Sequence, residues 1–182
     1  MIAYKGFDPG LVCRGYQFGR GLNVTEQANC RANGFHCAED PLDCLSYYPN
    51  MKRSEYYLVD AGGDVDEDDR DSKIACTHLS ILKKLGSEEF FLHALAYRVD
   101  HPGRDWNCFV QKDSGRARSG FAIVRGTDPV AFGEKGDILA FAKESQDGKS
   151  IVQIAVVKVD GKKIKAGVMY DAKLTEREAA HI

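Results

Sequence analysis

The alternation of apolar and polar residues predicts β-structure along most of the chain. Residues 2–7, IAYKGF, alternate and are followed by the turn residues DPG, a pattern typical of a short strand. Residues 54–63 and 73–82 are rich in aromatic and branched side chains, which favour strands. The segment 150–173 predicts two further strands about a turn at Asp160 and Gly161, because Asp-Gly between apolar runs is a hairpin signal.

Two segments depart from this alternation and predict helices. Asp40 can cap a short helix that begins at Pro41 and ends before Pro49, since proline is tolerated in the first turn of a helix but not in its interior. Over residues 86–99 the apolar positions recur at helical spacing behind an acidic first turn. We therefore expect a strand, a turn and a short helix near residue 40, and a longer helix from about residue 87.

A change in composition divides the chain. Residues 100–119 lose the apolar period and gain glycine, proline and basic residues, and glycines then separate short apolar pieces over residues 120–136, which suits short meandering strands. The fold class predicted is α+β, mostly β with a few short helices. An N-terminal α+β module is expected over residues 1–105 and a small β-rich meander or hairpin module over residues 106–182. Whether the two modules share one hydrophobic core or have one each stays open.

Composition and charge narrow the function classes. A formal net charge of -2 gives no electrostatic indication of nucleic-acid binding. Because the chain shows no apolar run near the ~18 residues of a membrane span, and no basic segment leading into an apolar one at its start, a soluble cytoplasmic protein is expected. The six cysteines are accordingly expected to be reduced thiols.

Neither of the two obvious metal motifs is satisfied. Cys30, Cys37 and Cys44 lie at intervals of seven residues and the chain has no CxxC pair, whereas structural zinc sites use close pairs. The acidic run 64–71 lacks the glycine and glutamate of a calcium-binding EF-hand loop. We predict no metal site, and a solvated acidic loop that could contact a basic partner surface through Asp64, Asp66, Glu67, Asp68, Asp69 and Asp71.

The stretch GFHCAEDPLDCLSYYP, residues 34–49, is the strongest candidate for a binding site. Glycine permits close approach of the backbone to a ligand, and aromatic rings stack on flat heterocycles. Such a combination shapes a pocket more naturally than a metal cage. We expect Gly34, His36 and the tyrosine pair Tyr47 and Tyr48 to line a cleft together with residues of the first strand.

Four strings resemble an uncharacterised family of phage and prophage proteins: YKGF from residue 4, CRGYQF from residue 13, residues 34–49, and AVVKVDGKKIKAGVMY from residue 155. This resemblance implies a phage- or prophage-encoded binding protein that acts in the host bacterial cell. Its partner would be a host macromolecule, for example a protein of a bacterial defence system. Such a function requires no cofactor.

A second resemblance concerns the ADP-ribosyltransferase-like fold. Tyr4 and Gly6 match its opening motif, and Gly34, Phe35 and His36 with Tyr47 or Tyr48 match the strand and helix that hold nicotinamide. This resemblance implies binding of NAD or a related nucleotide, as an enzyme or without catalysis.

The match departs from that pattern at two places. Lys5 stands where many such enzymes have histidine or arginine, and the late-strand catalytic glutamate has only Glu134 and Glu144 as candidates. The catalytic residues therefore stay unknown, and both functions stay open.

Overall fold

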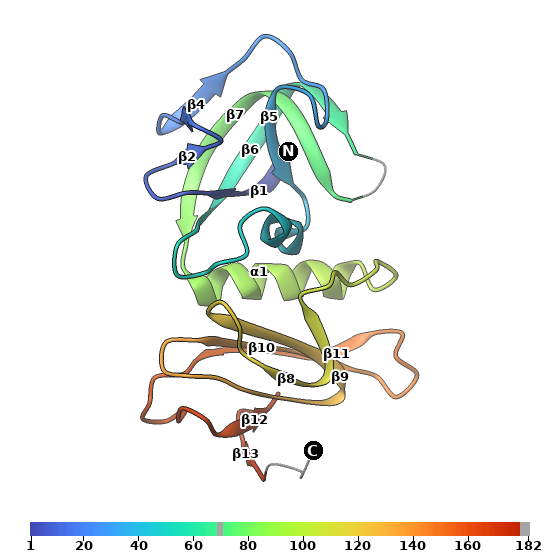
Figure 1. The fold of residues 1–182 in the computed structure, drawn as a ribbon. Coiled ribbons are helices and arrows are strands. Elements are labelled where there is room, and N and C mark those ends of the chain that lie inside the picture. The colour runs from blue at the N-terminus through green and yellow to red at the C-terminus, as the bar shows by residue number, and fades with distance from the viewer. Residues whose placement is uncertain (69–70, 179–182) are drawn as a thin grey trace. The chain divides into compact units, whose positions relative to one another are not determined.

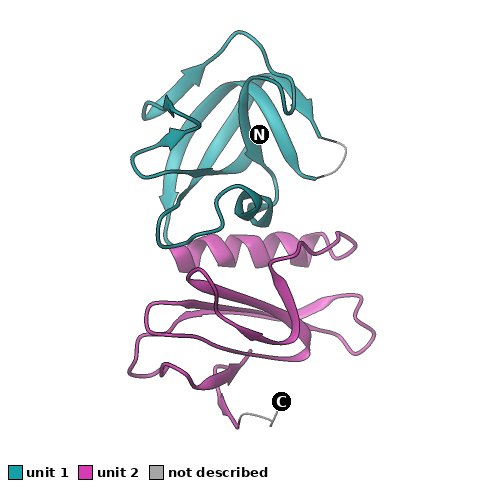
Figure 2. Cartoon of the chain, viewed as in Figure 1, with its two compact units in different colours: residues 1–86 teal, residues 87–182 magenta. Residues whose placement is uncertain are grey.

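The computed structural model describes residues 1–68 and 71–178, and the chain forms two compact units, residues 1–86 and 87–182 (Figures 1 and 2). Both units are built mainly of strands, and helices are few and short. The predicted class, mostly β with a few short helices in two modules, is confirmed. The units divide between Gly86 and Ser87, whereas the sequence analysis placed the module boundary after residue 105.

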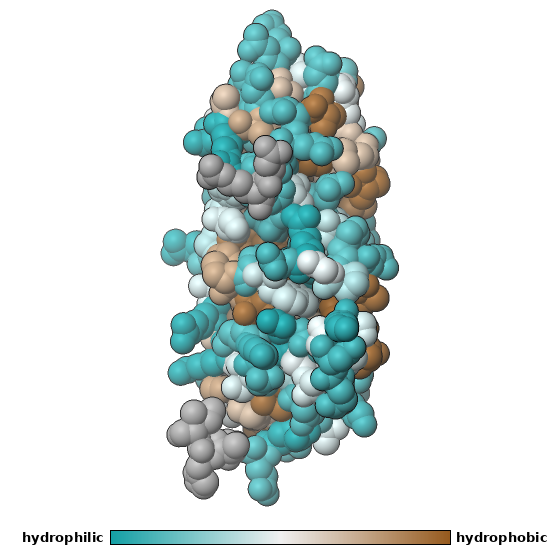
Figure 3. All heavy atoms as spheres, turned by 90° about the vertical axis from the view of Figure 1, so that its right-hand side faces the viewer, coloured by the Kyte–Doolittle hydropathy of each residue, from teal (hydrophilic) through white to brown (hydrophobic). Residues whose placement is uncertain are grey.

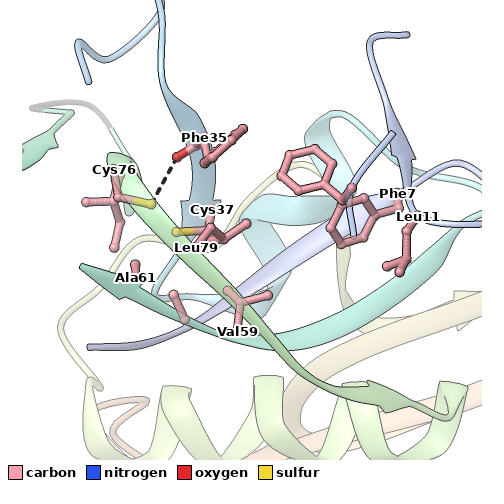
Figure 4. Close-up of a cluster of buried hydrophobic side chains, with 11 residues drawn as sticks. Phe7, Leu11, Phe35, Cys37, Val59, Ala61, Cys76 and Leu79 are labelled. Carbon is pink, nitrogen blue, oxygen red and sulfur yellow. Dashed lines mark hydrogen bonds between the residues drawn. The ribbon is translucent and has the colours of Figure 1, made fainter. Parts of the chain in front are cut away.

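Each unit has a cluster of buried apolar side chains of its own. Hydrophilic side chains cover much of the face drawn in Figure 3, and hydrophobic residues lie there in separate groups. In unit 1 the cluster comes from the inward positions of several strands (Figure 4). It includes Phe7, whose ring meets that of Phe18 edge to face at a centroid distance of 5.2 Å. In unit 2 the cluster includes Phe141 and the fully packed Tyr170.

Unit 1 is a small closed antiparallel barrel. Strand β1 pairs with β5 and β6, and β7 pairs with the same two strands, so these four strands form a ring, with β4 added to β7. A separate two-stranded hairpin, β2–β3, turns at Arg14 and Gly15, both at positive φ (51° and 81°), as tight hairpin turns require. The strands are β1 Ile2–Phe7, β2 Val12–Cys13, β3 Tyr16–Gln17, β4 Gly21–Val24, β5 Phe35–Ala38, β6 Glu55–Glu67 and β7 Lys73–Leu85.

The predicted strand, turn and short helix are confirmed around residue 40. Strand β5 is followed by η1, a 3₁₀ helix over Pro41–Ser46. The Asp40 side chain accepts a hydrogen bond from the Leu42 backbone N–H at 2.9 Å, which caps the helix. Leu42 and Leu45 are fully buried, and η1 packs on β1. These contacts fix where the chain leaves η1.

The acidic run was predicted to be a loop, but only part of it is one. Strand β6 continues to Glu67, with Val65 opposite Cys76 and Glu67 opposite Ile74 on β7. An irregularity in register between Gly62 and Val65 bends the hairpin, as β-bulges do. Because every residue of β6 from Gly63 to Glu67 is exposed, carboxylates are tolerated within the strand. Asp69 lies outside the described residues.

Unit 2 combines one helix with a six-stranded sheet. The helix α1, Ser87–Asp100, confirms the predicted helix and buries Phe90, Phe91, Ala94, Leu95 and Arg98. The sheet has the order β11-β10-β9-β12-β13, and β8 also pairs with β9. Its strands are β8 Val110–Arg116, β9 Phe121–Phe132, β10 Ile138–Glu144, β11 Ile151–Lys158, β12 Met169–Asp171 and β13 Glu176–Arg177.

Two strand predictions in unit 2 were wrong. Residues 121–132 form one long strand, not short meandering pieces, because Gly126 at φ 146° is accommodated within the strand as an irregularity opposite β8. The hairpin about Asp160 and Gly161 does not form, since β11 pairs with β10. Instead the Asp160 side chain accepts hydrogen bonds from Lys162 and Ile164 N–H groups, which folds the segment into a loop.

Candidate functional site

A cavity of about 840 Å³ lies in unit 1. Strands β1 and β5 share a single residue pair, Tyr4 opposite Ala38, so most of their length is free of mutual pairing. The lining residues come from these two strands, the β2–β3 hairpin, the segment 24–34, η1 with the two residues that follow it, and the start of β7. The cavity, hereafter the cleft, is therefore an opening in the wall of the barrel where two strands do not pair.

All seven residues that the sequence analysis singled out line this cleft. They are Tyr4, Gly6, Gly34, Phe35, His36, Tyr47 and Tyr48. Side chains alternate along β1, so Tyr4 and Gly6 lie on the opposite face from the buried Ala3 and Phe7. The short helix η1 ends directly before Tyr47 and Tyr48 and brings them to the same opening. Their role in binding stays a prediction.

Gly6 is needed for the close packing of Tyr48 against β1. A Cβ atom at position 6 would lie 2.4 Å from Cδ2 of Tyr48 and 2.8 Å from its Cγ. The Tyr48 ring is held at its far end, where its hydroxyl donates to Cys13 Sγ at 3.1 Å. Burial, followed by this hydrogen bond, raises the pKa of Tyr48 well above its ordinary value. One wall of the cleft is thus an ordered, neutral phenol.

His36 lies in the cleft as a neutral imidazole. Its Nε2 accepts a hydrogen bond from the Arg31 backbone N–H at 3.0 Å, which leaves Nδ1 to carry the proton. Burial is the main cause that lowers the pKa of His36 below its ordinary 6.5, and the charges of Lys5, Lys73 and Arg14 lower it further. The site is therefore electropositive, and His36 is predominantly uncharged at neutral pH.

Lys5 is the cleft residue whose importance the sequence analysis missed. It lies on the inward side of β1, only 4% exposed, and its Nζ donates to the backbone carbonyl of His36. The same ammonium lies 5.2 Å from the ring centroids of both Phe7 and Phe18. The signal in the sequence was its position: side chains alternate along β1, so Lys5 lies on the same inward side as the apolar residues Ala3 and Phe7. Lys5 places a positive charge at the cleft in mostly apolar surroundings, where water screens charge weakly.

The rim of the cleft carries an ordered cluster of charges. Lys73 Nζ donates to the Tyr47 hydroxyl at 2.7 Å and forms ion pairs with Asp68 and Asp71 at 3.4 and 3.5 Å. Asp68 also accepts two hydrogen bonds from the Arg31 guanidinium, at 2.6 and 2.9 Å. Part of the acidic run thus holds the rim in place by ion pairing.

The cleft could hold a flat ring and an anionic group. Its lining has four basic and three acidic residues; two of the basic ones, Arg31 and Lys73, pair with Asp68 at the rim. Among the carboxylates, Asp43 accepts two hydrogen bonds from Ser72. The basic residues are Lys5, Arg14, Arg31 and Lys73, the acidic residues are Asp8, Asp43 and Asp71, and the aromatic residues are Tyr4, Tyr16, Phe18, Phe35, Tyr47 and Tyr48.

Several catalytic arrangements receive no support from the cleft. Glu134 and Glu144, the candidate glutamates, belong to unit 2, and Glu144 accepts from Arg125 at 2.8 Å. All six cysteines are free thiols. Burial raises the pKa of Cys44 in the cleft to about 12, so its thiolate is scarce at neutral pH. Within residues 1–68 and 71–178, no group of three His, Cys, Asp or Glu residues could hold a metal ion.

Comparisons with known proteins assign a family. Within the described part of the chain, no helix is long and apolar enough to cross a membrane. No curated protein and no solved structure matches the chain. The model of one family, described as a domain of unknown function, DUF7666, matches residues 1–93. That match spans all of unit 1 and every cleft residue, and the chain therefore belongs to the DUF7666 family.

Proposed function

We propose that unit 1 binds a nucleotide-like ligand in the cleft, with NAD as the compound to test first. The observation that carries this proposal is the buried Lys5 ammonium beside a cavity of about 840 Å³ lined with aromatic rings. A nucleotide combines the two features that such a site complements, a flat heterocycle and a phosphate anion.

The dimensions and the placement of groups support the proposal. Small-molecule sites are typically clefts of roughly 300–1,000 Å³ with a largely apolar lining and a few placed polar groups. Tyr47 is 62% exposed, so its ring is accessible for stacking at the rim. Lys5 and Arg14 supply positive charge on the side of β1 and the β2–β3 hairpin. The similarity of residues 4–6 and 34–48 to the ADP-ribosyltransferase-like pattern points to the same ligand class.

We propose binding, without a transfer reaction, as the activity of this cleft. A transferase of that type needs a carboxylate placed to stabilise an oxocarbenium-like centre, and both candidate glutamates belong to unit 2. Two of the three cleft carboxylates are engaged, Asp43 with Ser72 and Asp71 with Lys73. The cleft favours recognition of a ligand over its chemical conversion.

Calorimetric titration of the intact chain with NAD, ADP-ribose and nicotinamide tests the proposal. Tyr47→Ala should weaken binding about tenfold, because stacking on an aromatic ring contributes ~1–3 kcal/mol, while Tyr47→Phe retains the ring and most of the affinity. Arg14→Gln should weaken binding of the two phosphate-bearing ligands roughly threefold. Arg20→Gln, on an exposed arginine outside the cleft lining, is the matched control. Absence of binding by all three compounds would reject the proposal.

As a second function we propose binding of a host macromolecule with a basic surface, which the outer half of strand β6 favours; the phage or prophage origin of the chain rests on the sequence resemblance alone. Asp64, Asp66 and Glu67 are exposed there, and clustered carboxylates attract basic surfaces. Affinity capture from host lysate should compare the wild-type chain with an Asp64→Asn and Glu67→Gln double variant. A host protein retained by the wild type and by an Asp60→Asn control, but lost with the double variant, would support this function. Equal retention by all three would count against it.

A further inference from the structure

Three chain segments lie side by side at one edge of the sheet in unit 2. They are the turn 117–120 between β8 and β9, the turn 133–137 between β9 and β10, and the loop 159–163 that follows β11. Ile138 pairs with Phe121 on one side and with Lys158 on the other, so all three segments adjoin the same row of the sheet. The Ile138 backbone N–H also donates to the Gly120 carbonyl at 3.0 Å. This edge shares no residue with the cleft, so its role is independent of the function proposed for unit 1.

Contacts between the segments bring their side chains onto one surface. The Gly136 backbone N–H donates to the Val159 carbonyl at 2.8 Å, which joins the second turn to the loop. The Lys135 side chain lies over the same loop, since a Cβ atom at Gly161 would lie 3.3 Å from its Cδ. Neighbouring strands of a sheet lie about 4.8 Å apart, so exposed side chains of these adjacent segments are neighbours on the surface.

Five exposed cationic side chains gather on these segments and on the strand end beside them. They are Arg116, Arg118, Lys135, Lys162 and Lys163. Within the part of the chain that the structure describes, none of these five forms an ion pair. The same segments hold three carboxylates, of which Asp137 is only 5% exposed and Glu134 and Asp160 are exposed. Five unpaired cations thus face solvent beside two exposed carboxylates, and we call this surface the basic edge.

The net charge of the whole chain conceals this clustering. The formal charge of -2 gave no electrostatic indication of nucleic-acid binding, but that sum covers both units. Recognition of a polyanion depends on where the cations lie, because a basic stripe on one face acts locally. The cations of the basic edge come from separate segments of the chain, so no long basic run marks them in the sequence.

The lack of apolar anchors on the basic edge decides which polyanion it fits. In the described part of unit 2, the large apolar side chains that are exposed are Leu92, Val99, Val152 and Leu174, and none lies on these segments. Protein interfaces depend on buried aromatic or apolar anchors, and membrane-surface segments insert apolar side chains. A phosphate backbone is bound by charge alone, because each cation releases condensed counterions. We propose that the basic edge binds the phosphate backbone of a nucleic acid, DNA or RNA, without reading its base sequence.

Fluorescence anisotropy of a labelled single strand and of a duplex, each of about 20 nucleotides and titrated with the intact chain, tests this surface. The logarithm of the binding constant should fall with the logarithm of salt concentration at a slope of about -3 to -4, since each phosphate contact contributes about -0.7 to -0.9. The double variant Lys135→Gln with Lys162→Gln should weaken binding at low salt about tenfold or more and reduce the slope by about 1.5. Both lysines are exposed, so the fold is retained.

A matched double variant, Lys112→Gln with Lys149→Gln, removes the same charge from exposed positions of unit 2 outside the basic edge. It should bind almost as the wild type does, and so should Arg14→Gln in the cleft. Strands of different base sequence should bind equally well.

Three results would overturn the proposal. One is the absence of any anisotropy change at low salt with about 100 µM protein, the weak end of non-specific binding. Another is equal affinity of the two double variants, which would place the nucleic acid elsewhere on the chain. The third is displacement of the labelled strand by polyglutamate at lower concentration than by an unlabelled strand of equal charge, which would identify an acidic polypeptide as the ligand instead.

Discussion

Replacing Gly6 by alanine should destabilise unit 1 through a single steric conflict. The new Cβ would lie 2.4 Å from Cδ2 of Tyr48, closer than carbon atoms approach without movement. The Tyr48 hydroxyl is hydrogen-bonded to Cys13, and its backbone carbonyl accepts from the Tyr56 hydroxyl. Because both ends of Tyr48 are held, the ring can move away only by breaking one of these contacts.

The magnitude follows from the general cost of overpacking. Inserting a methyl group into a packed site costs about 1–3 kcal/mol. For a domain of about 60–100 residues, each kcal/mol lowers Tm by roughly 4–8 °C, so we expect a loss of about 10 °C for the unit 1 transition. Urea denaturation followed by circular dichroism, with hydrogen exchange of the β1 amides, measures the effect. Gly62→Ala is the matched control, because nothing lies within 4 Å of its added Cβ.

A double-mutant cycle shows whether the conflict is the cause. In a Tyr48→Ala background, Gly6→Ala should cost less than about 0.5 kcal/mol, since the ring that it meets is gone. The reasoning is refuted if Gly6→Ala leaves the stability of unit 1 unchanged. It is also refuted if the substitution is equally harmful in both backgrounds.

Four further predictions concern the same unit and the cysteines. Because burial lowers the pKa of His36, the unfolded chain takes up a proton near pH 6.5 that the folded chain does not. The free energy of unfolding should therefore fall as the pH drops from about 7 to 5. Urea midpoints measured across this range should vary less in His36→Gln than in the wild type. Asp40→Ala removes the cap of η1 and should cost about 1 kcal/mol, read from the same urea curves. Asp68→Asn should lower the urea midpoint, since Asp68 pairs with Arg31 and Lys73, and a midpoint equal to that of Asp64→Asn would contradict this. Alkylation of the unfolded chain without reductant should add six adducts by intact mass, and fewer would indicate disulfides.

Local signals explain why the surroundings of residue 40 could be predicted from the sequence. Asp40 and Pro41 act within one turn of the helix that they start, and alternation along residues 2–7 marks a strand regardless of its partners. The closure of the barrel could not be predicted in this way, because it depends on the pairing of β7 with both β5 and β6. No short-range pattern specifies such pairings. Gly126 was misleading for the same reason, since the neighbouring strand determines whether a glycine ends a strand or interrupts it.

The candidate site divides in a similar way. The seven residues predicted to share a cleft do line one cavity, because strand β1, strand β5 with the residue before it, and the two residues that follow η1 carry all of them. The cationic part was missed: Lys5 was noted only as a departure from a motif, and Lys73 enters from β7, far along the sequence. Burial of a lysine by two phenylalanine rings depends on tertiary packing, which single-sequence patterns do not contain.

The most direct test of the central claim is an amide chemical-shift map of the intact, ¹⁵N-labelled chain titrated with NAD. We expect saturable shifts that concentrate on the cleft, at Gly6, Gly34, His36 and Tyr47, and that require about tenfold more NAD in Tyr47→Ala while the remaining spectrum stays folded. Shifts confined to unit 2, or none at all at millimolar NAD, would contradict the claim that the cleft of unit 1 is a nucleotide site.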